Sequence, residues 1–177
     1  MDRRSLIKHA GIAGVLAAGV APAVHAQTAV RWRLASSFPK SLDTIFGSAE
    51  MFSKTLKALS GGKFECSVHA AGELMPPFGV VDAIQNGTVE MAQTAPYYFT
   101  GKDSIFAFVC AVPFGLTARQ MDAWMEHGNG RKLMDAFYAN YNIKSRSAGN
   151  TGTQMGGWYR KEINTVEDLK GLKMRMG

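Results

Sequence analysis

The 177-residue sequence has only two cysteines and four histidines, and it has no unbroken apolar run of the about 20 residues that a membrane span needs. So few cysteines exclude a disulfide-dense miniprotein, and the lack of low-complexity tracts argues against a disordered chain. Phosphate-binding loops, dinucleotide-binding glycine motifs and the Gly-x-Ser-x-Gly elbow are also missing. These absences favour a globular binding protein over an enzyme.

The sequence has a net positive charge, but its basic residues are not concentrated in one stretch. The 20 Lys and Arg residues exceed the 14 Asp and Glu residues, which gives a net charge of +6, but the basic residues are scattered in ones and twos. Because no basic stripe could follow a phosphate backbone, we expect no nucleic-acid partner. Cys66 and Cys110 lie in apolar stretches, which favours buried free thiols, although pairing stays open in an oxidising compartment.

The N-terminus has the pattern of an export signal. Arg3 and Arg4 precede an uncharged run over residues 10–24, and Val24-His25-Ala26 stands before Gln27. This order of a basic, an apolar and a small-residue region is typical of a twin-arginine signal peptide, and the run is too short for a membrane anchor. The sequence therefore predicts a signal peptide over residues 1–26, cleavage after Ala26, and a protein of the bacterial periplasm.

The first half of the remaining chain alternates between strand and helix patterns. Two-residue alternation predicts strands, and apolar positions three and four apart predict helices. The order strand, helix, strand, helix, strand indicates an α/β fold with a parallel sheet. The predicted elements are strands at residues 30–34, 64–68 and 88–94 and helices at 44–59 and 80–84.

The second half gives weaker signals. Residues 105–113 are almost wholly apolar and predict a buried segment, and Thr117 with Gln120 resembles a capping box that opens a helix. Thr165 and Asp168 predict a second, shorter capped helix that Gly171 closes. The remaining predicted elements are a helix through Leu133, Phe137 and Tyr141 and strands at 143–147 and 172–176.

Several polar and aromatic residues follow the predicted strands, where ligands of parallel sheets bind. A small acid could be held by an arginine through two parallel hydrogen bonds, reached by an amide, and enclosed by aromatic walls. Each residue also has a plain structural interpretation, as a surface arginine, a turn asparagine or a core tyrosine. The candidates are Ser36, Ser37, Phe38, Tyr97, Tyr98, Asn150, Gln154 and Arg175.

Residues 27–177 resemble one protein family, the DctP-type solute-binding subunits of TRAP transporters, which are tripartite ATP-independent periplasmic carriers. The resemblance is closest to the branch that binds 2-oxo acids, lactate and mannitol or chloroaromatic compounds. It implies a periplasmic-binding-protein-like fold of two α/β lobes that close on the ligand. The motifs that carry it are Trp32-Arg33-Leu34-Ala35-Ser36-Ser37-Phe38-Pro39, Ala71-Gly72-Glu73-Leu74, Tyr97-Tyr98, Asn150-Thr151-Gly152-Thr153-Gln154 and Gly171-Leu172-Lys173-Met174-Arg175.

The resemblance also implies roles for individual residues. Arg175 matches the arginine that clamps the ligand carboxylate, Gln154 matches a glutamine that reaches the ligand, and Tyr97, Tyr98 and Asn150 lie in segments that line the pocket. In this branch a sodium or calcium ion bridges ligand and protein, and no covalent cofactor is used. We expect the metal ligands to lie beyond this chain. The partners implied are a small carboxylate and the small and large TRAP permease subunits, and a homodimer stays open.

Members of the family are much longer than this chain, so we expect an N-terminal portion of such a protein. The expected organisation is a signal peptide at 1–26, the first lobe at 27–152 and the start of the second lobe at 153–177. Two other functions remain open from the residues alone. One is an exported enzyme that acts on a small organic acid, and the other is an ABC-type periplasmic binding protein.

Overall fold

Three parallel strands form one sheet in the structure, a computed structural model that describes residues 29–174. The signal-peptide prediction for residues 1–26 and the clamp predicted for Arg175 therefore fall outside the described residues. The strand order is β2-β1-β3, with Val30 opposite Phe64 and Leu34 opposite Met91. The strands are β1 (Val30–Ser36), β2 (Phe64–His69) and β3 (Met91–Gln93).

Helices cover both faces of this sheet. Neighbouring residues of a strand point to opposite faces, so Leu34 packs with Ala49 of α2 (Asp43–Leu59) while Ala35 packs with Val80 of α3 (Val80–Gln85). This arrangement confirms the predicted α/β class with a parallel sheet. The third strand is shorter than the predicted 88–94, because only Met91, Ala92 and Gln93 pair with β1.

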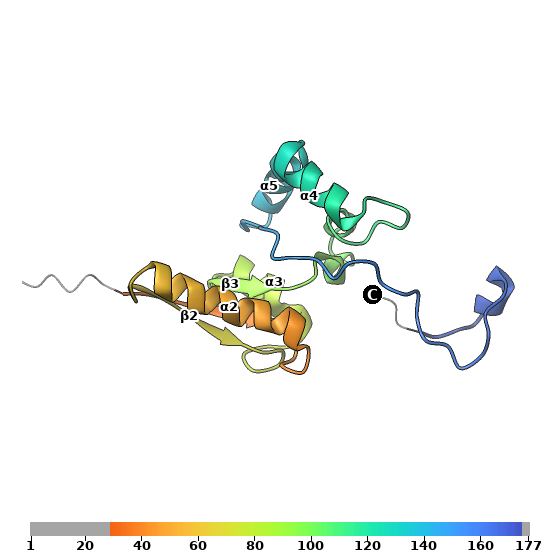
Figure 1. Cartoon of the computed structure of the whole chain (residues 1–177), viewed down its shortest axis with the longest axis horizontal. Helices are drawn as coiled ribbons and strands as arrows, with labels where there is room; N and C mark the ends of the chain where they lie inside the picture. Colours follow the sequence, from red (N-terminus) through yellow and green to blue (C-terminus); the bar gives the residue numbers. More distant parts are fainter. Residues whose placement is uncertain (1–28, 175–177) are drawn as a thin grey trace, which may run out of the picture.

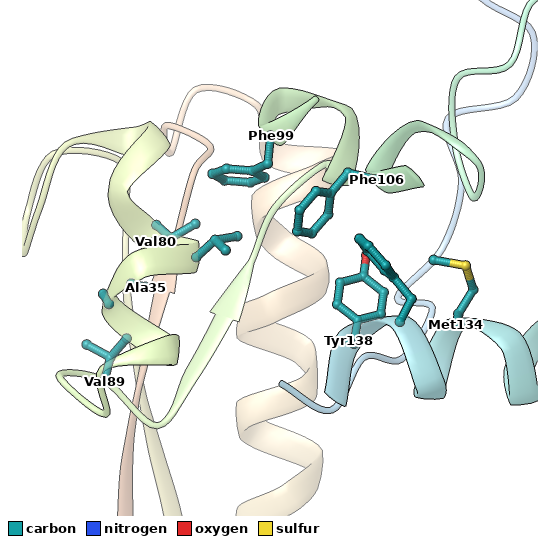
Figure 2. Packing of buried hydrophobic residues seen from close by; sticks show 10 residues of the cluster. Ala35, Val80, Val89, Phe99, Phe106, Met134 and Tyr138 are labelled. Atoms are coloured by element: carbon teal, nitrogen blue, oxygen red, sulfur yellow. The ribbon is translucent and has the colours of Figure 1, made fainter. Parts of the chain in front are cut away.

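The larger core lies on the α3 side, around Phe106. Its ring is 1% exposed and stands 5.0 Å from the ring of Phe137 and 6.0 Å from that of Phe99. Figure 2 shows Phe106 between Phe99 and Tyr138, with Val80 and Ala35 beyond Phe99. The elements that supply this core are β1, α3, η2 (Pro96–Phe99), η3 (Ser104–Ala107) and α5 (Gly130–Ala139).

Helices α4 (Ala118–His127) and α5 form a pair. Local sequence signals specify where α4 begins and where the chain turns from α4 into α5. Thr117 and Gln120 make the predicted capping box at the first helix. Gly130 opens the second, and a Cβ atom there would lie 2.7 Å from the Trp124 ring, so only glycine allows this close approach. The two helices therefore turn sharply at residues 128–130.

Three predictions in the second half are wrong. Residues 143–147 form no strand, because no strand among the described residues pairs with them. Of the predicted buried segment 105–113, Phe106 is buried while Phe108 and Val112 are exposed, because the η3 turn directs only one ring inward. Cys110 is likewise exposed rather than buried, whereas Cys66 is buried, and both thiols are free.

Residues 147–174, which we call the C-terminal segment, form an extended run that leaves the helices (Figure 1). Its one helical turn is η4 (Val166–Leu169), which Thr165 and Asp168 cap as predicted and which Gly171 follows with φ +72°. The predicted strand 172–176 is absent over residues 172–174, and its last two residues are outside the described part of the chain.

Candidate functional site

Ser36, the last residue of β1, and Ser37, which follows it, are structural at this edge of the sheet. The Ser36 side chain donates a hydrogen bond to Gln93 Oε1 at 2.9 Å, and Ser37 donates to the Pro77 carbonyl at 2.7 Å. Both serines are buried. Their hydroxyl groups therefore join the loop after β1 to β3 and to η1 (Pro77–Gly79), which leaves them little surface for a ligand.

Gln93 extends the same network to the first helix. Its side-chain amide donates to the Ile45 carbonyl at 2.8 Å and to Ser48 Oγ at 2.9 Å. Because the amide and its carbonyl oxygen bond on opposite sides, Gln93 links α2 to Ser36 through one side chain. Side-chain hydrogen bonds thus cross-link the carboxyl edge of the sheet to α2.

Above this network lies a set of four rings, which we call the aromatic group: Phe38, Phe78, Tyr97 and Tyr98. The ring of Tyr98 is its centre, 4.7 Å from that of Tyr97, 5.2 Å from that of Phe78 and 6.3 Å from that of Phe38. The contacts of Tyr98 with Tyr97 and Phe78 are edge to face, a favourable aromatic arrangement, whereas the Phe38 ring is tilted against Tyr98. The structure thereby brings together three of the predicted site residues and adds one that sequence reasoning missed.

The members of the aromatic group differ in exposure. Phe38 is buried, Tyr97 and Tyr98 are partly buried, and Phe78 is 54% exposed. Phe38 therefore packs beneath Tyr98 rather than presenting a free face. Phe78 could have been found from its position directly after Pro76-Pro77, in the connection that follows the second strand.

The structure places Asn150 and Gln154 in the exposed C-terminal segment. The Asn150 side chain accepts a hydrogen bond from the Gly152 amide at 3.1 Å, and the Gln154 amide donates to Thr151 Oγ1 at 2.7 Å. These bonds shape their own loop. The structure therefore does not join either residue to the aromatic group by a hydrogen bond.

An ion pair flanks the sheet on the side of β3. The Glu90 carboxylate accepts hydrogen bonds from the Arg33 guanidinium at 2.8 Å and from the Arg33 backbone amide, also at 2.8 Å. These bonds hold the pKa of Glu90 at about 2, below its ordinary value of 4.5. The sequence interpretation took Arg33 as part of a scattered basic surface, whereas here it ties β1 to the start of β3.

A second pair fixes the turn after β2. Glu73 binds Lys40 Nζ at 2.7 Å and accepts a hydrogen bond from the Ala70 amide at 3.0 Å. Both bonds lower the pKa of the Glu73 carboxyl, the Lys40 bond most. Gly72 has φ +85°, a backbone conformation that favours glycine. The Ala71-Gly72-Glu73 motif is therefore a braced turn beside the site.

Neither a metal centre nor a membrane span can be built from the residues described. Over residues 29–174, no three or more His, Cys, Asp or Glu side chains gather closely enough to hold a metal ion. In the same range, every helix is too short or too polar to cross a bilayer. The described residues alone do not supply the cation site that the family resemblance implies.

Comparison with known proteins identifies the family. The profile of the bacterial extracellular solute-binding proteins of family 7, DctP, matches residues 35–177. The chain belongs to this family. Membership confirms the resemblance seen in the sequence and makes the chain part of a solute-binding receptor family.

Solved structures of TRAP solute-binding proteins share the fold of this chain. A TRAP solute-binding protein from Bordetella bronchiseptica is 46% identical with a TM-score of 0.82, and its structure holds calcium and picolinate in one active site of a mixed-occupancy dimer. A Pseudoalteromonas atlantica protein is 44% identical with a TM-score of 0.80 and holds sodium and pyruvate. Each match covers 84% of this chain, and 44% and 45% of those chains.

A sequence relative adds a functional description. The monocarboxylate 2-oxoacid-binding periplasmic protein of Nostoc is 50% identical over 147 residues, which is 83% of this chain and 40% of that protein. The chain thus spans less than half the length of the DctP relatives it matches.

Proposed function

We propose that this chain is the N-terminal portion of a periplasmic solute-binding subunit of a TRAP transporter. It captures a small 2-oxo or 2-hydroxy acid and delivers it to the small and large permease subunits. The observation that carries the proposal is the 40–46% identity to three solved DctP proteins that hold picolinate or pyruvate together with sodium or calcium. The aromatic group at the carboxyl edge of the sheet supports it.

The proposed division of labour follows from side-chain chemistry. Arg175 clamps the carboxylate, because a planar guanidinium offers two parallel donors to its two oxygens. Gln154 donates to the neighbouring oxo or hydroxyl oxygen, Asn150 orders the loop that carries it, and Tyr97 and Tyr98 form an apolar wall. Phe38, predicted as a pocket residue, supports Tyr98 from below.

We further propose the organisation that brings these parts together. Residues 1–26 are a twin-arginine signal peptide cleaved after Ala26, residues 27–152 are the first lobe, and residues 153–177 begin the second. The core agrees with a first lobe that contains Ile143, the last of the described residues that packs against it. The ligands of a bound cation would come from residues beyond this chain. A homodimer would form between complete subunits.

Calorimetry on the protein encoded by the complete reading frame tests the function. We expect pyruvate, longer 2-oxo acids or lactate to bind, and Arg175→Ala to lose at least about 2 kcal/mol of binding free energy, because the buried carboxylate would keep its charge and lose its partner. Arg160→Ala, at an exposed arginine of the C-terminal segment, is the matched control and should leave binding unchanged.

Three results would contradict the proposal. Tight binding of a sugar or a cationic amino acid without acid binding would favour another class of solute. Consumption of the acid during incubation would favour an exported enzyme. An ATPase gene beside the membrane-subunit genes would favour an ABC-type binder, whereas two membrane subunits without an ATPase favour a TRAP system.

A further inference from the structure

We propose that Gln93 is a positioning residue for the acid-binding site: its one amide group holds both ends of the connection between β1 and α2, residues 37–42, and thereby fixes Phe38 at the carboxyl edge of the sheet. The inference rests on the function proposed above and deepens it, because it names what keeps the first lobe in shape for the ligand. Gln93 lies outside the family motifs identified in the sequence and outside the predicted site residues, and in this role it acts through Phe38 without touching the acid.

The side chain of Gln93 reaches both ends of the connection. At the β1 end, Gln93 Oε1 accepts a hydrogen bond from the Ser36 hydroxyl at 2.9 Å. At the α2 end, Gln93 Nε2 donates to the Ile45 carbonyl at 2.8 Å and to Ser48 Oγ at 2.9 Å, and both partners lie in the first two turns of the helix. One side chain therefore sets the separation of the two ends of the loop.

The partners of Gln93 allow its amide one orientation. The Ser48 hydroxyl donates to the Ile45 carbonyl at 2.7 Å, so on the α2 side Gln93 faces two oxygens that need a donor. An amide turned the other way would place its own carbonyl oxygen against them. Among the described residues, every buried side-chain polar atom has a partner, so this orientation is fully satisfied.

The hydrogen bonds continue from Gln93 to Phe38. The Oγ atom of Ser36, which donates to Gln93, accepts a hydrogen bond from the Phe38 amide at 3.0 Å. On its other side, the Phe38 carbonyl accepts from the Ala71 amide at 3.0 Å. The Phe38 side chain is buried, and its ring lies 6.3 Å from that of Tyr98. The position of Phe38 beneath the aromatic group therefore depends on Gln93 through Ser36.

The location of Gln93 in the sheet connects this network to ligand binding. Gln93 is the last residue of β3, Ser36 is the last residue of β1, and the Ser37 amide donates to the Gln93 carbonyl at 2.9 Å. Ligands of parallel sheets bind at the carboxyl ends of the strands. Since a binding site keeps its geometry through the bonds that support it, a displaced Phe38 should weaken the acid.

Calorimetry on the protein encoded by the complete reading frame, at about pH 8 and about pH 5 with sodium and calcium present, tests the assignment. The probe is whichever of pyruvate, 2-oxobutanoate and lactate the unmodified protein binds most tightly. The test variant is Gln93→Glu, which keeps the shape of the side chain but, when ionised, offers no donor to the Ile45 carbonyl and Ser48 Oγ.

The pH dependence of this variant distinguishes positioning from loss of the side chain. Two facing oxygens disfavour the ionised carboxyl, so its pKa should lie above the ordinary value of about 4.3, and the neutral acid, which can donate one hydrogen bond, forms as the pH falls. The facing groups are a carbonyl and two hydroxyls, which keep their charge state over this range. We expect binding at least about fivefold weaker than in the unmodified protein at about pH 8, with most of the loss recovered at about pH 5.

Gln120→Glu is the matched control. Gln120 Oε1 accepts hydrogen bonds from the amide and the hydroxyl of Thr117, and a carboxylate accepts both equally well. Its affinity should match that of the unmodified protein at both pH values. Ser36→Ala removes the link between Gln93 and Phe38 and should weaken binding equally at both pH values, which also tests the assignment should Gln93→Glu not fold at about pH 8.

The outcomes separate the two proposals. If the unmodified protein binds none of the three acids, the proposed function fails and the role of Gln93 with it. If it binds one but Gln93→Glu or, where that variant does not fold, Ser36→Ala keeps the native affinity, the role of Gln93 alone is overturned. Fewer binding sites per protein at unchanged affinity also overturns it, because a merely structural role removes folded molecules and leaves the others native.

Discussion

The body of the structure up to Ile143 and the C-terminal segment are held in different ways. In the body, side chains from distant parts of the sequence share one core, such as Ala35, Phe106 and Phe137. In the C-terminal segment, the hydrogen bonds and ion pairs of the described residues join near neighbours, such as Asn164 and Thr165 with Asp168. The body thus gains stability from tertiary packing, whereas the segment keeps only local turns.

The largest expected contrast comes from removing one aromatic side chain from each region. Phe106→Ala should lower the free energy of unfolding by about 3–5 kcal/mol, because it empties the centre of the core. Trp158→Ala should change it by less than about 0.5 kcal/mol, because Trp158 is 90% exposed. Urea unfolding of the 177-residue chain measures both, and equal effects would contradict the division into two regions.

Gln93 in the body and Gln154 in the C-terminal segment give a second comparison of stability between the two regions. Gln93→Leu should cost about 1–3 kcal/mol of folding stability, because it removes the acceptor of the buried Ser36 hydroxyl. Gln154→Leu should change stability by less than about 0.5 kcal/mol yet weaken acid binding by the complete protein at least about tenfold. Chemical unfolding and calorimetry on both variants separate these effects. A stability loss in Gln154→Leu as large as that in Gln93→Leu would show that the segment is packed after all.

The smallest expected effect is on acid sensitivity. The folded-state pKa of Glu90 is about 2 and lies below its ordinary 4.5, so the Arg33–Glu90 pair stabilises the fold above about pH 4.5, and this contribution is lost as the pH falls toward 2. Glu90→Gln should therefore flatten the fall of the urea midpoint between these two pH values.

Asp168→Asn tests the acid sensitivity of unfolding in the C-terminal segment, for comparison with Glu90→Gln in the body of the structure. The backbone amides of Thr165 and Asn164 lower the pKa of the Asp168 carboxyl, but neither core formed by the described residues includes a residue of η4. This variant should leave the acid slope of global unfolding unchanged. A slope that responds to Asp168 as much as to Glu90 would mean that η4 unfolds together with the sheet.

The sequence predicted features that depend on near neighbours. The capping boxes at Thr117 and Thr165, the two-residue alternation of β1 and the parallel order of the sheet all follow from local signals. Strand patterns at 143–147 and 172–174 failed because a strand also needs a partner, and none among the described residues provides one. A local alternation pattern and an available partner strand are therefore separate conditions for forming a β-strand.

The candidate site shows the same limit. Position after a strand singled out Tyr97 and Tyr98, whose rings the structure places together, but it could not tell that the hydroxyl groups of Ser36 and Ser37 bond to Gln93 and Pro77. It also missed Phe78, whose place depends on a contact 20 residues away in the sequence, with Tyr98. Exposure and long-range contact decide which candidate can meet a ligand, and neither is visible in a single sequence.

The bond from the Arg33 amide to Glu90 has one more consequence. β3 pairs with β1 only from Leu34 to Ser36, so the amide of Arg33 faces outward at the point where β3 has not yet begun. The Glu90 carboxylate occupies that donor, so a side chain continues the connection between β1 and the residues before β3 where the backbone ladder has not yet formed.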